Sequence, residues 1–185
     1  MVFITMYLMR WSIVRPILEL MGFEPQMPEL TFFLLVMSTV LITAAGNVIN
    51  DYHDVHADRF NHFDDVVIDR YISRRQAIII HFVLNSIGIL LGLFVTIYHH
   101  LYWLSPLFIL TPIIFWFYST SFKHKIFIGN LIVSLFTGMV PLLVILFEFP
   151  LLIKANRDIM QDFPNMFDKD RYSSHPLHHS LSNSL

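Results

Sequence analysis

The sequence predicts an all-α membrane protein, a multi-span helical bundle of about five transmembrane helices. Of its 185 residues, 55% are hydrophobic and only 14% are charged, whereas a soluble domain has about 25% charged residues. Not one Asp, Glu, Lys or Arg occurs between Gln76 and Phe122. A stretch of that length fits two spans of about 20 apolar residues each, joined by a short turn. We therefore expect the chain to be integral to a membrane.

Five apolar segments have the length and composition of spans. They cover residues 2–18, 31–50, 76–98, 101–122 and 126–147. The first contains Arg10 and Arg15, and a charge at mid-bilayer costs at least about 2.5–3.5 kcal/mol. Each arginine therefore needs a specific reason to be there, such as a polar cavity.

Small residues and prolines predict how the later spans pack. Gly88 and Gly92 are four residues apart in the third span, a spacing typical of a helix-packing face. Pro106 and Pro112 in the fourth span and Pro141 in the fifth predict kinks that pack against neighbouring helices.

The basic residues of the connections predict the orientation in the membrane. Residues 51–75 hold four arginines, and Lys123 and Lys125 follow the fourth span, whereas the links at 21–30 and 98–101 hold no Lys or Arg. By the positive-inside rule, 51–75 and 123–125 are expected to be cytoplasmic in a multi-pass protein of the cell membrane. Residues 1–153 then form the membrane-embedded domain. Residues 154–185 form a polar tail, expected to be a disordered or truncated loop.

Composition also argues against several classes of partner and site. A formal net charge of −2 without a basic stripe gives no reason to expect nucleic acid as a partner. The chain has no Cys, which excludes disulfides and thiolate metal sites. Its ten histidines show no convergent spacing, so we expect structural or surface roles for them.

Acidic residues gather at the end of the second span. If the helix continues past Asn50, each residue advances by about 100°, so Asn47, Asp51, Asp54 and Asp58 share an arc of about 60°, with Asn50 at its edge. Carboxylates four residues apart repel one another. Mg²⁺ would remove this repulsion, because it prefers carboxylate oxygens and shares its coordination with substrate phosphates. The alternative interpretation is the solvated end of a helix emerging into water.

This helix end resembles the first aspartate-rich motif of the UbiA superfamily of intramembrane prenyltransferases. The pattern is Asn50-Asp51-x-x-Asp54-x-x-x-Asp58 at the end of a membrane helix. The similarity continues in the family's order through residues 44–50, 71–77, 118–123 and 128–133 and covers about residues 2–153. Within the superfamily, the chain looks most like the geranylgeranylglycerol-phosphate geranylgeranyltransferase-like members.

The resemblance implies a helical bundle around a central cavity and an enzyme that depends on Mg²⁺. Such an enzyme transfers a polyprenyl group, here of geranylgeranyl type, from a polyprenyl diphosphate donor to a lipid or aromatic acceptor among the membrane lipids. Carried over by position, the expected metal ligands are Asn50, Asp54 and Asp58, and the expected catalytic residues are Asp54, Asp58, Tyr118 and Lys123. The residues expected to bind the donor diphosphate are Asn47, Asn50, Asp51, Arg74 and Arg75.

Simpler roles compete with these assignments at four positions. Tyr118 and Lys123 also fit an interfacial aromatic residue beside a lysine that extends to the membrane surface. Arg74 and Arg75 also fit charges that only set the topology.

The chain departs from the family pattern in one respect that concerns activity. Members of the family have about nine helices and a second Asp-rich motif on a later cytoplasmic loop. Asp158 and Asp162 of the tail are expected on the outer side and are not taken as that motif. We therefore expect the N-terminal half of the fold, apparently truncated after its fifth helix and inactive as this fragment. The alternative is a catalytically dead remnant that acts only as a membrane or subunit-interaction protein.

Another membrane enzyme class that uses Asp clusters, the CDP-alcohol phosphotransferases, is set aside. That class needs an Asp-Gly-x-x-Ala-Arg sequence between its acids. The segment from Asp54 to Asp58 lacks it.

Overall fold

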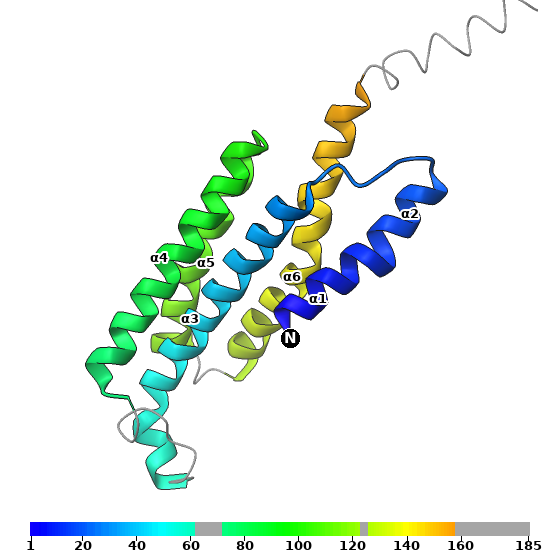
Figure 1. Ribbon diagram of the computed structural model, residues 1–185. Coiled ribbons are helices and arrows are strands. Elements are labelled where there is room, and N and C mark those ends of the chain that lie inside the picture. The colour runs from blue at the N-terminus through cyan, green and yellow to red at the C-terminus, as the bar shows by residue number, and fades with distance from the viewer. Residues whose placement is uncertain (62–71, 123–125, 158–185) are drawn as a thin grey trace, which may run out of the picture.

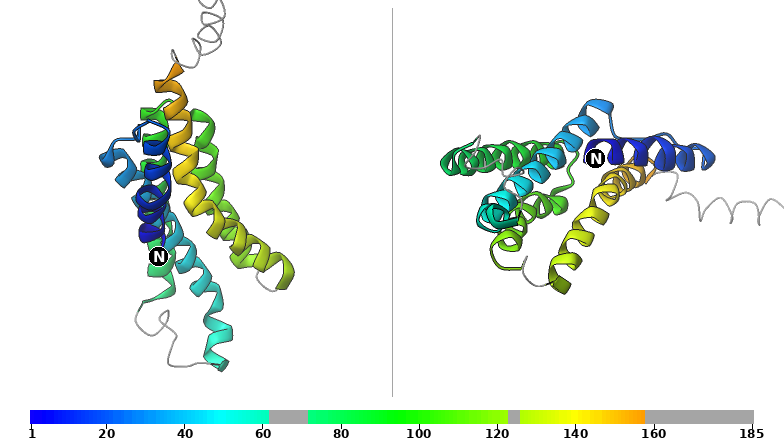
Figure 2. Two further views of the ribbon diagram at one scale, coloured as in Figure 1. Left: turned by 90° about the vertical axis from the view of Figure 1, so that its right-hand side faces the viewer. Right: turned by 90° about the horizontal axis from the view of Figure 1, so that it is seen from below.

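The computed structural model describes residues 1–61, 72–122 and 126–157, and the elements within them are helices. In chain order these are α1 (Val2–Leu8), the π-helix η1 (Met9–Val14), α2 (Arg15–Leu20), α3 (Glu29–Asn61), α4 (Arg74–Tyr98), the 3-10 helix η2 (Tyr102–Leu104), α5 (Ser105–Phe117), the π-helix η3 (Tyr118–Phe122) and α6 (Ile126–Ala155). Figures 1 and 2 show α3 in the middle, with α4 on one side and α1–α2 on the other. The predicted all-α fold is confirmed.

Four helical stretches of the described residues are long and apolar enough to cross a membrane. They are Glu29–His53, Arg74–Tyr98, Tyr102–Thr120 and Ser134–Ala155, which correspond to the second to fifth predicted spans. Residues 2–20 are helical but are not among them, so the expected count of five is corrected to four. The reason is that this segment contains three charged residues, Arg10, Arg15 and Glu19, which lower its hydropathy.

The two arginines of this segment are stabilised by partners and not by a polar cavity. Arg15 pairs with Glu19 at 2.7 Å, one turn along the helix. Arg10 is 6% exposed and donates to the carbonyl of Met27 at 2.5 Å. Its guanidinium also lies 3.6 Å from the carboxylate of Glu29. These partners compensate the charge that burial would otherwise make costly.

The last helix extends further than the sequence predicts. The fifth span was expected to end at residue 147, but α6 continues to Ala155 and takes in two residues of the expected tail. Glu148 is therefore inside the helix and only 3% exposed. Its carboxylate accepts hydrogen bonds from the backbone N–H groups of Gln26 and Met27, the latter at 3.2 Å. Residues 158–185 of the predicted tail lie outside the described residues.

The fourth span is built from three consecutive segments, η2, α5 and η3. Pro106 lies in the first turn of α5, where proline is compatible with a straight helix. The predicted kink at Pro106 stays a prediction. Pro112 lies inside α5 and Pro141 inside α6, as expected.

The two glycines of the predicted small-residue face pack α4 against two neighbours, Gly88 against α3 and Gly92 against α5. A β-carbon added at Gly88 would lie 2.7 Å from Cγ1 of Ile42 and 3.1 Å from the carbonyl oxygen of Ser38, both on α3. A β-carbon at Gly92 would overlap the ring of Phe108 on α5. The Ser38 hydroxyl also donates to the carbonyl of Gly88 at 2.6 Å. The predicted packing face is confirmed, because only glycine permits this close approach.

Replacing Gly88 with Ala should lower the free energy of unfolding by about 1–3 kcal/mol, because the added methyl group overpacks the α3–α4 contact. The measurement is a denaturant titration in detergent micelles. Gly138→Ala on α6 is the matched control: nothing lies within 4 Å of an added β-carbon there, so the better helix propensity of Ala should leave stability unchanged or raise it by up to about 1 kcal/mol. Equal effects at both positions would contradict the packing role of Gly88.

Candidate functional site

The helix that carries the acidic motif continues beyond its membrane span. The described apolar stretch of α3 covers Glu29–His53, and the helix continues to Asn61 through a segment that contains Asp54, Asp58 and Arg59. In Figure 1 the last turns of α3 project past the other helices of the bundle. Helical continuity past Asn50, on which the shared face depends, is therefore present. Asn47 and Asn50 lie inside the span, and Asp54 lies directly after it.

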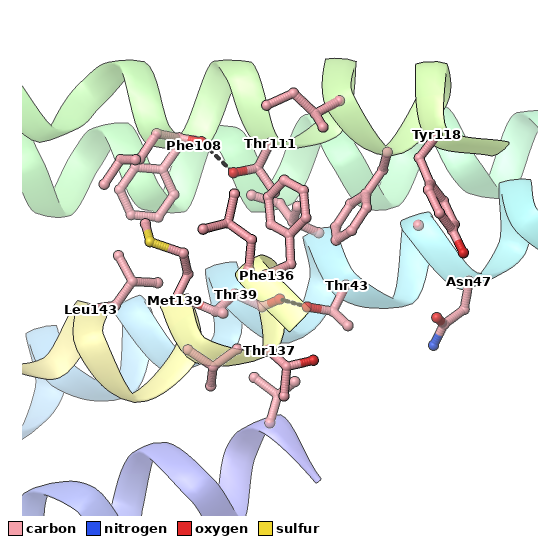
Figure 3. A pocket seen from close by; sticks show the side chains of 18 of the residues that line it. Thr39, Thr43, Asn47, Phe108, Thr111, Tyr118, Phe136, Thr137, Met139 and Leu143 are labelled. Carbon is pink, nitrogen blue, oxygen red and sulfur yellow. Dashed lines mark hydrogen bonds between the residues drawn. The ribbon is translucent and has the colours of Figure 1, made fainter. Parts of the chain in front are cut away.

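A cavity of about 600 Å³ lies between α1, α3, α5 and α6. Figure 3 shows Asn47 and Tyr118 at one end of the cavity and Phe108, Met139 and Leu143 towards the other. Asn50 also lines the cavity. Its volume is within the range of about 300–1,000 Å³ that is usual for ligand sites. The cavity therefore combines an amide- and phenol-bearing end with an apolar interior.

The threonines of the cavity wall do not make its interior polar. Thr39 donates to the carbonyl of Leu35 at 2.9 Å, Thr43 to that of Thr39 at 2.8 Å, and Thr111 to that of Leu107 at 2.6 Å. These hydroxyl hydrogens are therefore engaged within their own helices. Each leaves a methyl group and an oxygen lone pair for the cavity. Such a wall suits an apolar chain better than a ligand that needs hydrogen-bond donors.

The first turn of α4 lies beside the motif segment of α3. Ala77 is buried and packs with Val48 and Tyr52 of α3 and with Ile72. Ser73 caps α4 with Gln76 in a reciprocal capping box, which starts the helix two residues earlier than predicted. The first turn therefore holds Arg74, half-buried, and Arg75, exposed.

Basic side chains in the first turn reinforce the positive end of the helix dipole. Arg74 and Arg75 thus make the start of α4 electropositive next to the motif. This positive potential would attract an anion bound near Asn50.

The structure brings together part of the predicted site. Asn47, Asn50 and Tyr118 line one cavity, and Asp51 is exposed on α3. The remaining acids, Asp54 and Asp58, are in the helix, but their side chains are outside what the structure describes, and Lys123 lies outside the described residues altogether. Among the side chains that are described, no three His, Asp or Glu could hold a metal ion. The predicted metal site therefore stays a prediction.

The other end of the bundle is held by structural contacts. His99, in the link after α4, is 8% exposed and its Nε2 lies 3.0 Å from the hydroxyl of Thr31. Burial lowers the pKa of His99, and the positive charges of Lys154 and His100 act in the same direction. A neutral imidazole at this position suits a structural hydrogen bond, in line with the role expected from the sequence.

Sequence reasoning missed the contribution of the N-terminal segment to the cavity. Met1, Val2 and Thr5 line it, although α1 does not adjoin α3, α5 or α6 in the sequence. No local pattern could have predicted this, because it depends on how α1 packs against α3 and α6.

Comparison with known proteins decides the family. The profile of the UbiA prenyltransferase family matches residues 19–147. The chain belongs to the UbiA prenyltransferase family. With its four membrane-spanning candidates, it is a membrane protein.

Several curated relatives share one name, digeranylgeranylglyceryl phosphate synthase. The protein of Methanosphaera stadtmanae is 28% identical over an alignment of 148 residues, and the match covers 74% of this chain and 53% of the relative. That of Thermococcus kodakarensis is 33% identical over 117 residues, 63% of this chain and 40% of the relative. The chain thus spans about half the length of the curated relatives it matches. No solved structure matches it significantly.

In this UbiA-family chain, a bulky side chain inside the cavity should exclude long apolar ligands. Thr43→Trp should weaken the binding of a fluorescent long-chain alcohol at least about tenfold, a change of about 1.4 kcal/mol. The measurement is a fluorescence titration in lipid nanodiscs. Ile79→Trp on the exposed face of α4 is the control and should bind like the unmodified chain. Equal binding by both variants would show that apolar chains associate elsewhere.

Proposed function

We propose that the chain takes part in transferring a polyprenyl group from its diphosphate to an acceptor within the membrane, in a reaction that depends on Mg²⁺. The observation that carries the proposal is the polarity of the cavity along its length. Asn47 and Tyr118 lie at one end, Asn50 on the next turn of α3 also lines the cavity, and apolar side chains and threonines line the rest. A diphosphate at the first end and its prenyl chain inside would each meet matching chemistry. Membership of the UbiA family supports the same assignment.

The proposed donor is of geranylgeranyl type and the proposed acceptor is a lipid. The name of the relatives, digeranylgeranylglyceryl phosphate synthase, supports both choices. The volume of about 600 Å³ is compatible with a long prenyl chain. An acceptor dissolved in the bilayer would reach such a site without crossing water.

The residues of the motif fit Mg²⁺ by the chemistry of their donor atoms. Asn50, Asp54 and Asp58 offer amide and carboxylate oxygens, which this ion prefers over nitrogen or sulfur ligands. We assign these three as the ligands, with Asp51 and Asn47 in support. When bound, the ion would neutralise charge on the departing diphosphate.

Other residues of the chain would bind the donor and protect the reacting carbon. Arg74 and Arg75, with the start of α4, would attract the diphosphate electrostatically. Loss of diphosphate develops cationic character on the allylic carbon, so the site has to exclude water. The apolar walls contributed by α5 and α6 would serve this purpose. Tyr118 and Lys123 are proposed to act at the polar end.

We also propose that residues 51–75 and 123–125 are cytoplasmic and that residues 1–153 form the membrane-embedded domain. The chain lacks Cys, so single cysteines can be introduced into it directly. Labelling from outside intact cells with a membrane-impermeant maleimide should fail for Asn61→Cys and Asp65→Cys and succeed for Ser174→Cys. The reverse pattern would overturn this orientation.

Binding of geranylgeranyl diphosphate to the chain in nanodiscs should require Mg²⁺ and the motif. Asp54→Ala or Asp58→Ala should abolish the difference between Mg²⁺ and EDTA, because each substitution removes one proposed ligand. Asp69→Ala, eleven residues after Asp58 in the sequence, is the control and should keep that difference. Isothermal titration calorimetry measures all three variants. If binding responds to neither Mg²⁺ nor these substitutions, the acids are only the solvated end of a helix.

A transfer assay on the same preparation distinguishes an active enzyme from an inactive remnant. We expect the chain alone to form no measurable transfer product. The first motif would supply only part of the groups that neutralise the diphosphate, since the family also has a second Asp-rich motif. Removing even one stabilising group commonly costs about 10²–10³ in rate. With labelled donor, Mg²⁺ and glyceryl phosphate lipids, product that depends on Asp54 would show that this chain is sufficient. Donor binding without product would place the chain in a larger assembly, and the absence of both would favour the remnant.

A further inference from the structure

A buried histidine joins the three helices that carry the proposed site. His81 on α4 is 3% exposed, and its Nδ1 lies 2.9 Å from the carbonyl oxygen of Ala45 on α3. Its ring also lies 5.5 Å, centroid to centroid, from that of Trp116 on α5. A polar side chain in an apolar span has to find partners inside the protein, because lipid offers none. The partners of His81 come from α3 and α5.

The partners of the ring assign its tautomer. A carbonyl oxygen only accepts hydrogen bonds, so Nδ1 of His81 carries the hydrogen and donates to Ala45. Nε2 is then the acceptor for the side-chain amide of Asn85, one turn along α4, whose Nδ2 lies 3.1 Å away. Asn85 is itself 7% exposed. The amide thus orients the imidazole, and the imidazole binds α3.

The bond reaches α3 directly behind the cavity. Ala45 precedes Asn47 by two residues and Asn50 by five, and it faces α4 whereas the two asparagines line the cavity. Trp116 precedes Tyr118 by two residues on the helix opposite. On α4, Arg74 is seven residues before His81, which is two helical turns and about 20° around the axis. A shift of α4 along α3 would therefore move Arg74 relative to Asn50.

We propose that His81, oriented by Asn85, is a positioning residue that sets the register of α4 on α3 and so fixes the level of Arg74 beside the segment of α3 that carries the motif. A single buried polar contact is a known means of selecting one register among several that apolar packing allows. The inference rests on the proposed function, since it concerns where the diphosphate is held.

The two nitrogens of His81 can be tested separately. In His81→Asn the side-chain amide nitrogen occupies the place of Nδ1 and can still donate to Ala45. His81→Gln reaches only the place of Nε2, and His81→Leu has no polar group. The matched control is Ser38→Ala on α3, which removes the 2.6 Å hydrogen bond to Gly88 in the same interface between α3 and α4. Gly88 lies two turns of α4 beyond His81, further from the motif.

The first measurement is Mg²⁺-dependent binding of geranylgeranyl diphosphate in nanodiscs. We expect His81→Asn to bind within about threefold of the unmodified chain and His81→Gln and His81→Leu to bind at least about tenfold more weakly. Ser38→Ala should lose a comparable amount of stability and keep its affinity. Equal affinity in all variants would overturn the proposal. The proposal would also be overturned if Ser38→Ala bound the diphosphate more weakly in proportion to its loss of stability.

The second measurement does not need the ligand. Spin labels on His53→Cys and Ile79→Cys report the distance between α3 and α4 near the motif by pulsed electron resonance. The distance distribution should be kept in the His81→Asn and Ser38→Ala backgrounds and shifted or broadened in His81→Leu. Failure of the unmodified chain to bind the diphosphate would count against the proposed function alone, while an unchanged distance in His81→Leu would refute the register role by itself.

Discussion

The close approach of α3 to α4 is the contact on which the other features of the structure depend. Gly88 allows the two backbones to meet, and Ser38 fastens them with a hydrogen bond at the same level. Because α4 is fixed on one side of α3, the opposite side is left to line the cavity with α5 and α6. The start of α4, with Arg74, is brought next to the motif by the same packing.

Three buried polar side chains share one kind of partner. Arg10 and Glu148 both bind the segment around Met27, one through its carbonyl and the other through its N–H. His81 likewise binds the backbone of Ala45. In each case a buried side chain forms a hydrogen bond to the backbone of a segment distant in sequence, as an apolar environment favours. These contacts therefore carry positional information that apolar packing alone would not supply.

The cavity separates two kinds of chemistry along one axis. Its amide-bearing end coincides with the place where α3 leaves the apolar span, so charged ligands there would remain close to water. Its interior is bounded by side chains whose hydroxyl hydrogens are used within their own helices. An amphiphilic molecule with an anionic head and an apolar tail matches this arrangement better than a uniformly polar one.

The sequence by itself determined the helical membrane class, four of the five spans it predicted and the resemblance to the family, because span length, charge content and motif spacing are local properties. The same reasoning predicted the helix-packing role of Gly88 and Gly92. Tertiary structure alone decided that Glu148 is buried, that Met1 and Thr5 line the cavity, and that His81 joins three helices. These features depend on contacts between segments far apart in the chain, and the energy of a polar group in a span is set by the partner it meets there, which no local pattern contains.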